Sequence, residues 1–266
     1  MNEKHQQLLA KLGFRFGVNG PHAARTMMFD DIAVLLSHVP VSAEYQTYSN
    51  EVQVQNTLGK PTKKARELAF RHMSSLYALS PDVPVFRAFR RLWATDEAAR
   101  PVLALTIAMA RDPLLLGTQD FILGKQLGEV VSRESLETLL ASQNIDRFSS
   151  ASLKSFAQNV NGSWTSAGFL SGRSRKTRSE PVVTPANAAF CLFLGYLEGA
   201  SGQRLFTTRW MRLLGQSQDR LEELATIAYH RGLLVFMNAG GVKEVRFPDY
   251  LTPEEERIRQ EISHVV

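Results

Sequence analysis

The chain between residues 149 and 183 reads SSASLKSFAQNVNGSWTSAGFLSGRSRKTRSEPVV. Apolar side chains recur at helical spacing over 149–160, which predicts a helix there. The apolar pairs 169–170 and 182–183 flank a flexible basic tip, so we expect them to form the two strands of a hairpin. A helix followed by a basic hairpin is the second half of a winged helix-turn-helix.

The residues before this stretch complete the motif. Ser132 is a favourable N-cap for a helix over 132–140, and a short turn at 144–147 separates that helix from the next one. The same order of elements recurs near the C-terminus. There, helices expected at 207–214 and 219–231 precede apolar runs at 233–237 and 242–247 that are joined by a glycine-rich turn. The two halves share no residue-level identity, so the repeat is one of architecture only.

The first 130 residues show helical periodicity almost throughout. Thr62 follows Pro61 and predicts the start of a strong helix, whereas 39–60 is rich in Pro, Ser, Tyr and Asn and holds either a short strand or a loop. We therefore predict a mainly α protein, a helical bundle followed by two winged helix-turn-helix-like segments with short β-hairpins. The expected parts are an N-terminal extension with a first helix at 1–61, the helical bundle at 62–130, a winged-helix-like segment with a basic wing at 131–184, a second winged-helix-like segment at 185–250, and an acidic helical tail at 251–266.

Composition excludes several classes of protein. The single cysteine, Cys191, excludes a disulfide framework and a multi-cysteine metal site. No two of the six histidines are three or four residues apart, so no helix presents a paired-histidine metal site. No run reaches the roughly 18 apolar residues of a membrane span, and the N-terminus lacks a signal-peptide pattern. We expect a cytoplasmic protein that has no metal, no cofactor and no membrane association.

The sequence lacks the motifs of common catalytic sites. It contains no G-x-x-x-x-G-K-[ST], no G-x-G-x-x-G and no G-x-S-x-G. Cys191 lies in an apolar helix, where a thiol is a small buried hydrophobic group of low reactivity. We therefore expect a protein that is not an enzyme and has no small-molecule substrate.

Positive charge gathers in three patches of this chain, which carries 31 Lys and Arg against 26 Asp and Glu. The first patch covers 147–179, contains no acidic residue, and occupies the position of a wing. The candidate DNA contacts are Arg173, Arg175, Lys176, Arg178, Lys154 and Asn159 in the first patch, Lys63, Lys64 and Arg66 in the second, and Arg209 and Arg212 in the third. The alternative interpretations are a solvated loop for the first patch, a salt-bridged helix face for the second, and a protein-packing winged helix for the third.

Five segments carry a resemblance to a known protein family. They are 64–76, which begins Lys64-Ala-Arg66-Glu-Leu; 114–121, with its Asp120-Phe121 pair; Glu129-Val-Val131; 148–160; and 225–234, which ends Gly232-Leu-Leu234. Over 62–247 the chain resembles BrxA, a small component of BREX bacteriophage-exclusion systems. It departs from the family in an additional stretch at about 1–55 and in the acidic tail.

The resemblance implies a largely helical fold with winged-helix-like parts and a helical part similar to the NusB antitermination fold. It also implies DNA binding without a known enzymatic activity. The partners it implies are the other defence subunits, namely a site-specific methyltransferase, a phosphatase-like protein and an ATPase. It supplies no invariant binding motif, so the candidate contacts come from charge placement alone.

Three functions follow as hypotheses. The first is a DNA-binding accessory component of a phage-defence complex, which contacts the backbone of double-stranded DNA with low sequence specificity. The second is a protein-interaction or scaffold module within a multi-subunit complex. The third is a winged-helix transcriptional regulator, which would dimerise and bind a palindromic site.

Overall fold

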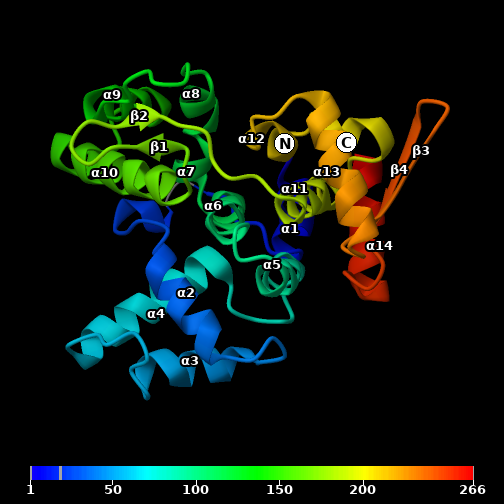
Figure 1. Cartoon of the computed structure of the whole chain (residues 1–266). Coiled ribbons are helices and arrows are strands. Elements are labelled where there is room, and N and C mark those ends of the chain that lie inside the picture. Colours follow the sequence, from blue (N-terminus) through cyan, green and yellow to red (C-terminus); the bar gives the residue numbers. More distant parts are fainter. Residues whose placement is uncertain (1, 18–19, 266) are drawn as a thin grey trace. The chain divides into compact units, whose positions relative to one another are not determined.

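The computed structural model describes residues 2–17 and 20–265, and most of them lie in α-helices, which confirms a mainly α fold (Figure 1). The chain divides into two compact units. Unit 1 contains 1–14, 83–106 and 182–266, and unit 2 contains 15–82 and 107–181. Both units are discontinuous in sequence, and the bundle predicted at 62–130 contributes to each. Whether the five predicted parts fold independently therefore stays a prediction.

Unit 1 is built around an apolar helix, α11, which packs against α5, α12 and α13. Its elements are α1 (Glu3–Lys11), α5 (Pro84–Thr95), the first part of α6 (Arg100–Arg111), α11 (Pro185–Leu197), η2 (Gly202–Thr207), α12 (Arg209–Leu213), α13 (Gln218–His230), β3 (Val235–Ala239), β4 (Val242–Arg246) and α14 (Pro253–Val265). The backbone N–H of Thr184 donates to the Asn187 side chain at 2.9 Å at the start of α11, which is one half of a capping box. Cys191 is fully buried in this helix as predicted, and burial raises the pKa of its thiol.

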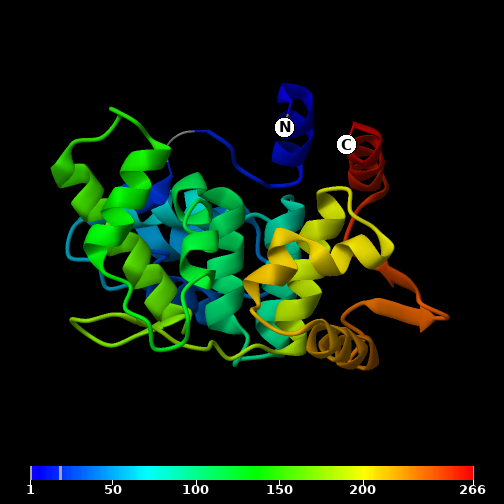
Figure 2. The same cartoon turned by 90° about the horizontal axis from the view of Figure 1, so that it is seen from above.

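The acidic tail is helical as predicted, and it packs within unit 1. Glu255 accepts a hydrogen bond from the Arg87 guanidinium at 2.5 Å, and Glu256 accepts one from the Tyr196 hydroxyl at 2.8 Å. The ion pair between Lys4 and Glu261, at 2.8 Å, joins α1 to α14. The two ends of the described chain consequently lie side by side (Figures 1 and 2).

The predicted second hairpin forms, with its first strand two residues later than expected, at 235–239 and not at 233–237. Strands β3 and β4 pair antiparallel, from Val235 opposite Arg246 to Ala239 opposite Val242. Gly240 and Gly241 connect them, and both have positive φ, at +58° and +84°. Two left-handed residues at the turn are what a two-residue hairpin loop requires.

Unit 2 contains the other half of the helices and the first hairpin. Its elements are η1 (Pro21–Ala23), α2 (Phe29–His38), α3 (Tyr45–Gln53), α4 (Lys63–Tyr77), the end of α6, α7 (Pro113–Leu116), α8 (Gln119–Leu123), α9 (Arg133–Gln143), α10 (Ser150–Ser166), β1 (Leu170–Ser171) and β2 (Thr177–Arg178). The side chain of Thr62 accepts a hydrogen bond from the backbone of Ala65 at 3.1 Å, so Thr62 caps α4 as predicted.

Two local predictions differ from the structure. The strand or loop expected within 39–60 is the helix α3, because Tyr48 and Val52 are both fully buried and lie four residues apart on one helical face. The expected strand at 182–183 is a connection without regular structure, and β2 lies earlier in the chain, at Thr177–Arg178. The segments that pair with β2, described below, determine where this strand lies.

No single helix among the residues described here has the length and apolar composition of a membrane span. The helix pair Arg100–Arg111 and Pro113–Leu123 meets those criteria together, across a bend of 110°.

Three polar side chains far apart in sequence meet in the interior of unit 2. The Nδ1 of His22 lies 2.8 Å from Asp112 Oδ2, and its Nε2 lies 2.7 Å from Ser163 Oγ. All three residues are fully buried. The Ser163 hydroxyl also accepts a hydrogen bond from the backbone of Met27 at 2.8 Å and donates one to the carbonyl of Asn159 at 3.0 Å. These contacts attach η1 and the start of α2 to α10.

Asp112 also begins α7. Its Oδ1 accepts hydrogen bonds from the backbone of Leu114 at 2.9 Å and Leu115 at 3.4 Å, so it is the cap that its position before Pro113 predicts. Burial by itself raises the pKa of this carboxyl, but hydrogen bonds from the ring and backbone of His22 outweigh burial and hold the pKa below its ordinary 3.8. Asp112 is therefore ionised in the folded protein at neutral pH.

We expect Asp112→Asn to destabilise the protein by about 2–3 kcal/mol at pH 7, because several hydrogen bonds to a charged buried group are weakened together. The folded-state pKa of Asp112 lies below its unfolded value. Its contribution is thus complete above that value and is lost as the pH falls through the folded-state pKa. Urea denaturation at pH 7 and at pH 3 measures the difference between wild type and variant. The difference should shrink at pH 3, and an unchanged difference would contradict this role; Asp120→Asn, at an exposed carboxylate, is the control.

Candidate nucleic-acid interface

Strand β2 is hydrogen-bonded on both of its edges. On one edge it pairs antiparallel with β1, with Leu170 opposite Arg178 and Ser171 opposite Thr177. On the other edge it pairs with 128–131, the stretch that leads into α9. The backbone of Arg178 donates to the Glu129 carbonyl at 2.8 Å, and the backbone of Val131 donates to the Lys176 carbonyl at 2.9 Å. The base of the β1–β2 hairpin is therefore fixed beside the start of α9 (Figure 1).

The tip of this hairpin requires glycine at one position. Gly172 has a φ of +96°, and a Cβ built there would lie 2.1 Å from the carbonyl oxygen of Arg175. The Lys176 ammonium donates to the Gly172 carbonyl at 2.6 Å, which closes the turn. Arg173 and Arg175 are exposed, and neither makes a hydrogen bond or an ion pair with any residue that the structure describes. Their guanidinium groups are therefore available to an outside partner.

Arg178 differs from its basic neighbours because it is buried, with 8% of its surface exposed. Its guanidinium donates to the carbonyl oxygens of Phe169, at 3.2 Å, and Ser179, and lies 5.4 Å from the centre of the Phe169 ring. Burial lowers the pKa of this guanidinium, against the opposing charge of Glu180. Arg178 holds the base of the hairpin together and does not present its charge to solvent.

Helix α10 supplies the remaining first-patch residues. One face is buried through Phe156, Val160 and Trp164, whereas Lys154 and Gln158, four residues apart, are exposed. Asn159 is half-buried, and its amide donates to the carbonyl of His22 at 3.0 Å. The structure thus leaves Lys154 available to a partner and uses Asn159 inside the unit.

A cavity of about 590 Å³ lies between the hairpin, the start of α9 and the middle of α10. Its lining includes four basic side chains, from Arg133, Arg173, Arg175 and Lys176, and one carboxylate, from Glu134. The Arg133 guanidinium forms ion pairs with two carboxylates, those of Glu134 and Glu137, each at 2.7 Å. The wall therefore carries a net positive charge, contributed mainly by the hairpin.

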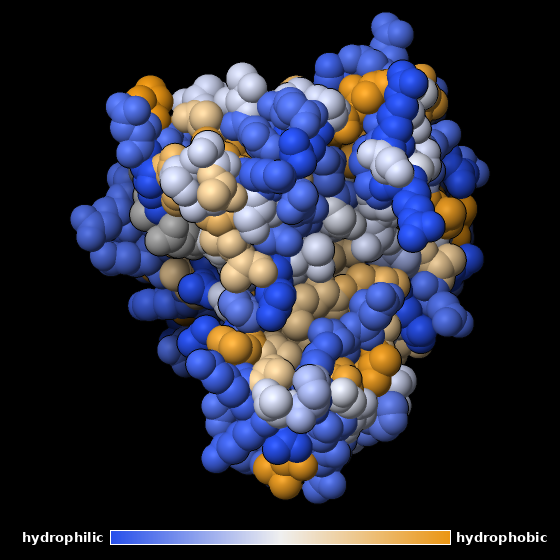
Figure 3. All heavy atoms as spheres, turned by 90° about the vertical axis from the view of Figure 1, so that its left-hand side faces the viewer, coloured by the Kyte–Doolittle hydropathy of each residue, from blue (hydrophilic) through white to orange (hydrophobic). Residues whose placement is uncertain are grey.

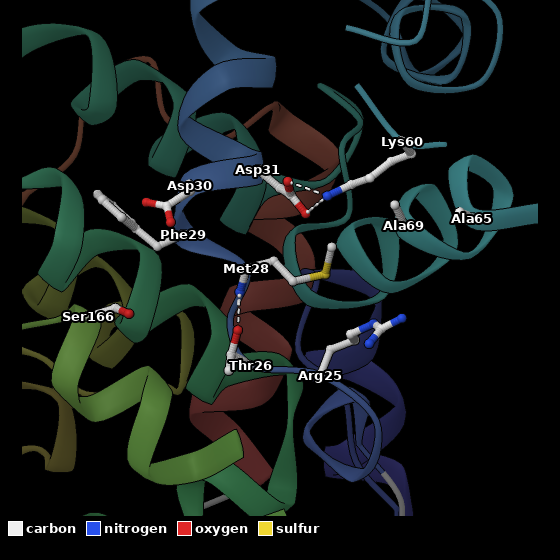
Figure 4. A pocket seen from close by; sticks show the side chains of 10 residues that line it. All are labelled: Arg25, Thr26, Met28, Phe29, Asp30, Asp31, Lys60, Ala65, Ala69 and Ser166. Carbon is white, nitrogen blue, oxygen red and sulfur yellow. Dashed lines mark hydrogen bonds and ion pairs between the residues drawn. The ribbon is translucent and has the colours of Figure 1, made fainter. Parts of the chain in front are cut away.

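A second cavity of about 430 Å³ in the same unit has a different character (Figure 4). Asp30 and Asp31 of α2 and Arg25 line it, and the Lys60 ammonium binds both oxygens of Asp31, at 2.8 and 2.9 Å. Two positive and two negative side chains balance one another there, and the Lys60 ammonium is already bound to Asp31. This cavity is less suited to an anion than the one at the hairpin.

The second predicted patch lies on α4, at the opposite end of the unit from the hairpin in Figure 1. Lys63 and Lys64 are exposed at the start of the helix, and Lys63 lies 3.9 Å from Glu67. Arg66 is half-buried, and its Nε is buried without a hydrogen-bond partner among the described residues. The structure does not bring these three residues together with the hairpin.

The third predicted patch belongs to unit 1, where acidic residues neutralise much of its charge. Arg209 pairs with Glu198 at 3.3 Å, and Arg212 is exposed. The neighbouring charges form ion pairs of their own, between Arg220 and Glu223 at 2.6 Å, between Arg246 and Glu244 at 3.1 Å, and between Lys243 and Glu222. Arg204 and Arg212 are exposed, and neither side chain has a hydrogen-bond or ion-pair partner among the described residues, so this surface also keeps two unpaired cations.

Charge placement along the sequence did not identify Arg133 or the stretch 128–131 as parts of the interface. The only local sequence signal for Arg133 was its position directly after the Ser132 cap. Among residues 2–17 and 20–265, no three His, Cys, Asp or Glu side chains gather closely enough to hold a metal ion.

We expect Gly172→Ala to open the hairpin, because the new Cβ meets a backbone carbonyl that cannot move aside. Amide hydrogen exchange at Val131 and Arg178, whose hydrogen bonds close the base of the hairpin, measures the effect. Gly59→Ala is a matched control, since Gly59 also has a positive φ, +61°, but has open space around it. Exchange at the two amides should become faster only in Gly172→Ala. Unchanged protection in that variant would show that the hairpin tolerates a Cβ beside the Arg175 carbonyl.

No protein-family model matches the chain, and no curated protein matches it significantly. Two solved structures are similar over nearly the whole chain. A crystal structure of SspB has 12% sequence identity and a TM-score of 0.54, and the match covers 97% of this chain and 99% of that one. A crystal structure of magnesium ion-bound SspB has 10% identity and a TM-score of 0.54, with 98% and 100% covered. At these identities the similarity concerns the fold alone.

Proposed function

We propose that this chain binds double-stranded DNA without catalysis, contacting the phosphate backbone through the β1–β2 hairpin. One observation carries the proposal: Arg173 and Arg175 are exposed and unpaired among the described residues, at the tip of a hairpin whose base is held on both edges. Guanidinium groups bind phosphate oxygens in a bidentate fashion. A rigid base lowers the entropy lost when such a tip is ordered on a ligand.

The order of the surrounding elements supports a winged-helix interpretation. Helix α9, helix α10 and the β1–β2 hairpin follow one another, and 128–131 adds a third chain to the hairpin. In winged helices the second helix of the motif enters the major groove while the wing contacts the backbone. Under this proposal Lys154 and Gln158, on the exposed face of α10, face the DNA beside the wing.

Low sequence specificity follows from the kind of residues available. Phosphate contacts fix the position and orientation of a protein on DNA without reading its sequence. The exposed basic residues Lys154, Arg173 and Arg175 suit this kind of binding. Hydrophilic residues cover much of the face drawn in Figure 3, where the strongly hydrophobic residues are scattered and a paler, mildly hydrophobic band crosses the middle.

The cellular role that we propose is that of an accessory component in a BREX-type phage-defence complex. It rests on the resemblance of 62–247 to the BrxA family. The methyltransferase, phosphatase-like and ATPase subunits of such a complex are the proposed protein partners. A winged-helix transcriptional regulator is the alternative in which the same hairpin would serve a palindromic site.

A protein-interaction role is the second candidate, and the β3–β4 hairpin favours it. Its charged residues pair with one another or with α13, as described above, while Met237 and Val242 expose 43% and 74% of their surface. Exposed apolar side chains next to charges that are already neutralised suit a protein partner better than a phosphate backbone. The two functions use different units of the chain and are compatible.

The salt dependence of DNA binding tests the proposal. Each phosphate neutralised by the protein contributes about 0.9 to the slope of log K against log salt concentration. The triple variant Arg173→Ala, Arg175→Ala, Lys176→Ala should therefore reduce the slope by up to about 2.7 on any duplex sequence. Fluorescence anisotropy with a random-sequence duplex, over ~50–300 mM salt, gives this slope.

The control variant removes three exposed arginines of unit 1, Arg204, Arg212 and Arg220, and so has the same net charge as the wing variant. Its slope should stay close to that of the wild type. An unchanged slope in the wing variant, or an equal reduction in the control, would overturn the proposal. Absence of binding at the lowest salt concentration would leave the interaction-module function as the better account.

A further inference from the structure

The cavity beneath the β1–β2 hairpin suits a different kind of phosphate from the one inside a DNA backbone. It measures about 590 Å³, which is within the range of pockets that hold small ligands. Its inner wall comes from α10, through Gln158 and Gly162, and its outer wall comes from the hairpin. An internal phosphate of a duplex is bonded to a sugar on each side, so it meets an open surface such as the hairpin tip. A phosphate at the end of a molecule is bonded on one side only and can enter a cavity.

The hairpin supplies most of the positive charge that is available to a ligand in this cavity. Arg173 and Arg175 both line it, and neither side chain has a hydrogen-bond or ion-pair partner among the described residues. Lys176 lines it too and gives one of the three N–H groups of its ammonium to the Gly172 carbonyl. Two unpaired guanidinium groups and a lysine with further donors therefore converge on one space.

The number and geometry of these donors favour a phosphate monoester over a diester. A monoester carries a charge of about −1.5 to −2 at pH 7 and has three terminal oxygens. A diester carries one charge and has two terminal oxygens. Each guanidinium binds two acceptors as a fork, so the forks of Arg173 and Arg175 use the three oxygens of a monoester more fully.

The cavity also has room for the group that carries the phosphate. A free phosphate ion fills only a small part of its volume, and Val130 contributes apolar surface beside the cations. A sugar has a carbon skeleton that can lie against such a surface. The lining also contains a carboxylate, that of Glu134, which binds Arg133 at 2.7 Å and repels a phosphate.

We propose that this cavity binds a terminal sugar phosphomonoester, with the phosphate held by Arg173 and Arg175. The monoester is either the phosphorylated end of a DNA strand or a free sugar phosphate. The proposal rests on the proposed function, because the same hairpin residues contact the DNA backbone there. It adds a preference for a phosphorylated end that contact with the backbone alone does not give.

Three forms of one DNA duplex test the preference. The first carries a phosphate on each 5′ end, the second carries 5′ hydroxyl groups, and the third is closed by a loop at both ends and so has no end. Fluorescence anisotropy with an internal label measures the affinity of the full chain for each. The wild type should bind the phosphorylated form at least about tenfold more tightly than the hydroxyl form, a difference typical of a hydrogen bond to a charged group.

Two double variants of equal charge locate the preference. Arg173→Ala with Arg175→Ala should abolish it, because the two guanidinium forks are removed. Arg204→Ala with Arg212→Ala removes two exposed, unpaired arginines of unit 1 and should retain it. Loss of the preference in both double variants, or in neither, would overturn the assignment to this cavity.

Glu134 gives a test in the opposite direction. Glu134→Gln removes the repelling carboxylate from the lining and should strengthen binding of the phosphorylated form by about two- to fivefold. Glu97→Gln is the matched control, since Glu97 is also an exposed carboxylate beside an arginine, Arg100 at 3.2 Å, but lies outside the lining. Equal effects of the two substitutions would contradict a site in the cavity.

Deoxyribose 5-phosphate and deoxyribose distinguish the two sources of the monoester, by isothermal titration calorimetry. A preference for the phosphorylated duplex supports a DNA end. Binding of deoxyribose 5-phosphate, without binding of deoxyribose and without a preference among the duplexes, supports a free sugar phosphate. If the wild type shows neither preference, the proposal is wrong, whatever the folding of the variants.

That failure is distinct from failure of the DNA-binding function. Binding of the closed duplex, with a salt slope that depends on the wing, would persist if only the cavity proposal were wrong. Binding of the phosphorylated end or of deoxyribose 5-phosphate, without any binding of the closed duplex, would overturn the DNA-binding function and leave the cavity proposal supported.

Discussion

The two-sided pairing of β2 is the constraint on which the candidate interface depends. A hairpin with strands of two residues is too short to be stable alone. Here the stretch 128–131 extends it, and the Phe169 ring packs edge-on against Trp164 of α10, with ring centres 5.0 Å apart. The indole of Trp164 in turn donates to the Thr118 hydroxyl at 2.9 Å. The basic tip therefore projects from a base that is held by three separate parts of unit 2.

Local chemistry explains which parts of the fold were predictable. Helix starts depend on residues within one turn, so the caps Thr62 and Ser132 were readable from the sequence and are confirmed. The position of β2 depends on pairing with residues more than forty positions earlier, at 128–131. The β-branched pair at 182–183 carried a stronger local signal for a strand, and long-range hydrogen bonding outweighed it. The helix α3 was missed because its buried face consists of only two residues.

The candidate interface was predictable in charge but not in geometry. Arg175 and Arg178 look equivalent in sequence, yet one is exposed and the other bonds to carbonyl groups within the hairpin base. Which side chain turns inward depends on strand register, which a single sequence does not reveal. The meeting of His22 with Ser163, separated by 141 residues, and the contribution of Asn161 to a cavity depend on the packing of distant helical segments, which a single sequence does not reveal either.

The chain thus offers two hairpins of unlike character. Cations on the β3–β4 hairpin are neutralised by their own neighbours, whereas the two arginines at the tip of the β1–β2 hairpin have no partner among the described residues. This difference, more than the total charge of the chain, favours the first hairpin as the site of DNA contact.

Site-directed crosslinking shows which of the two hairpins lies against DNA. Cys191 is fully buried, so Ser174→Cys adds one accessible thiol at the tip of the β1–β2 hairpin, and Ala239→Cys adds one at the tip of the β3–β4 hairpin. Each thiol carries a photo-crosslinker, and the protein is irradiated with duplex DNA under conditions where it binds. DNA contact through the β1–β2 hairpin predicts crosslinked DNA from position 174 and little from position 239. Crosslinking from position 239 alone, or from neither position while the protein is bound, would contradict it.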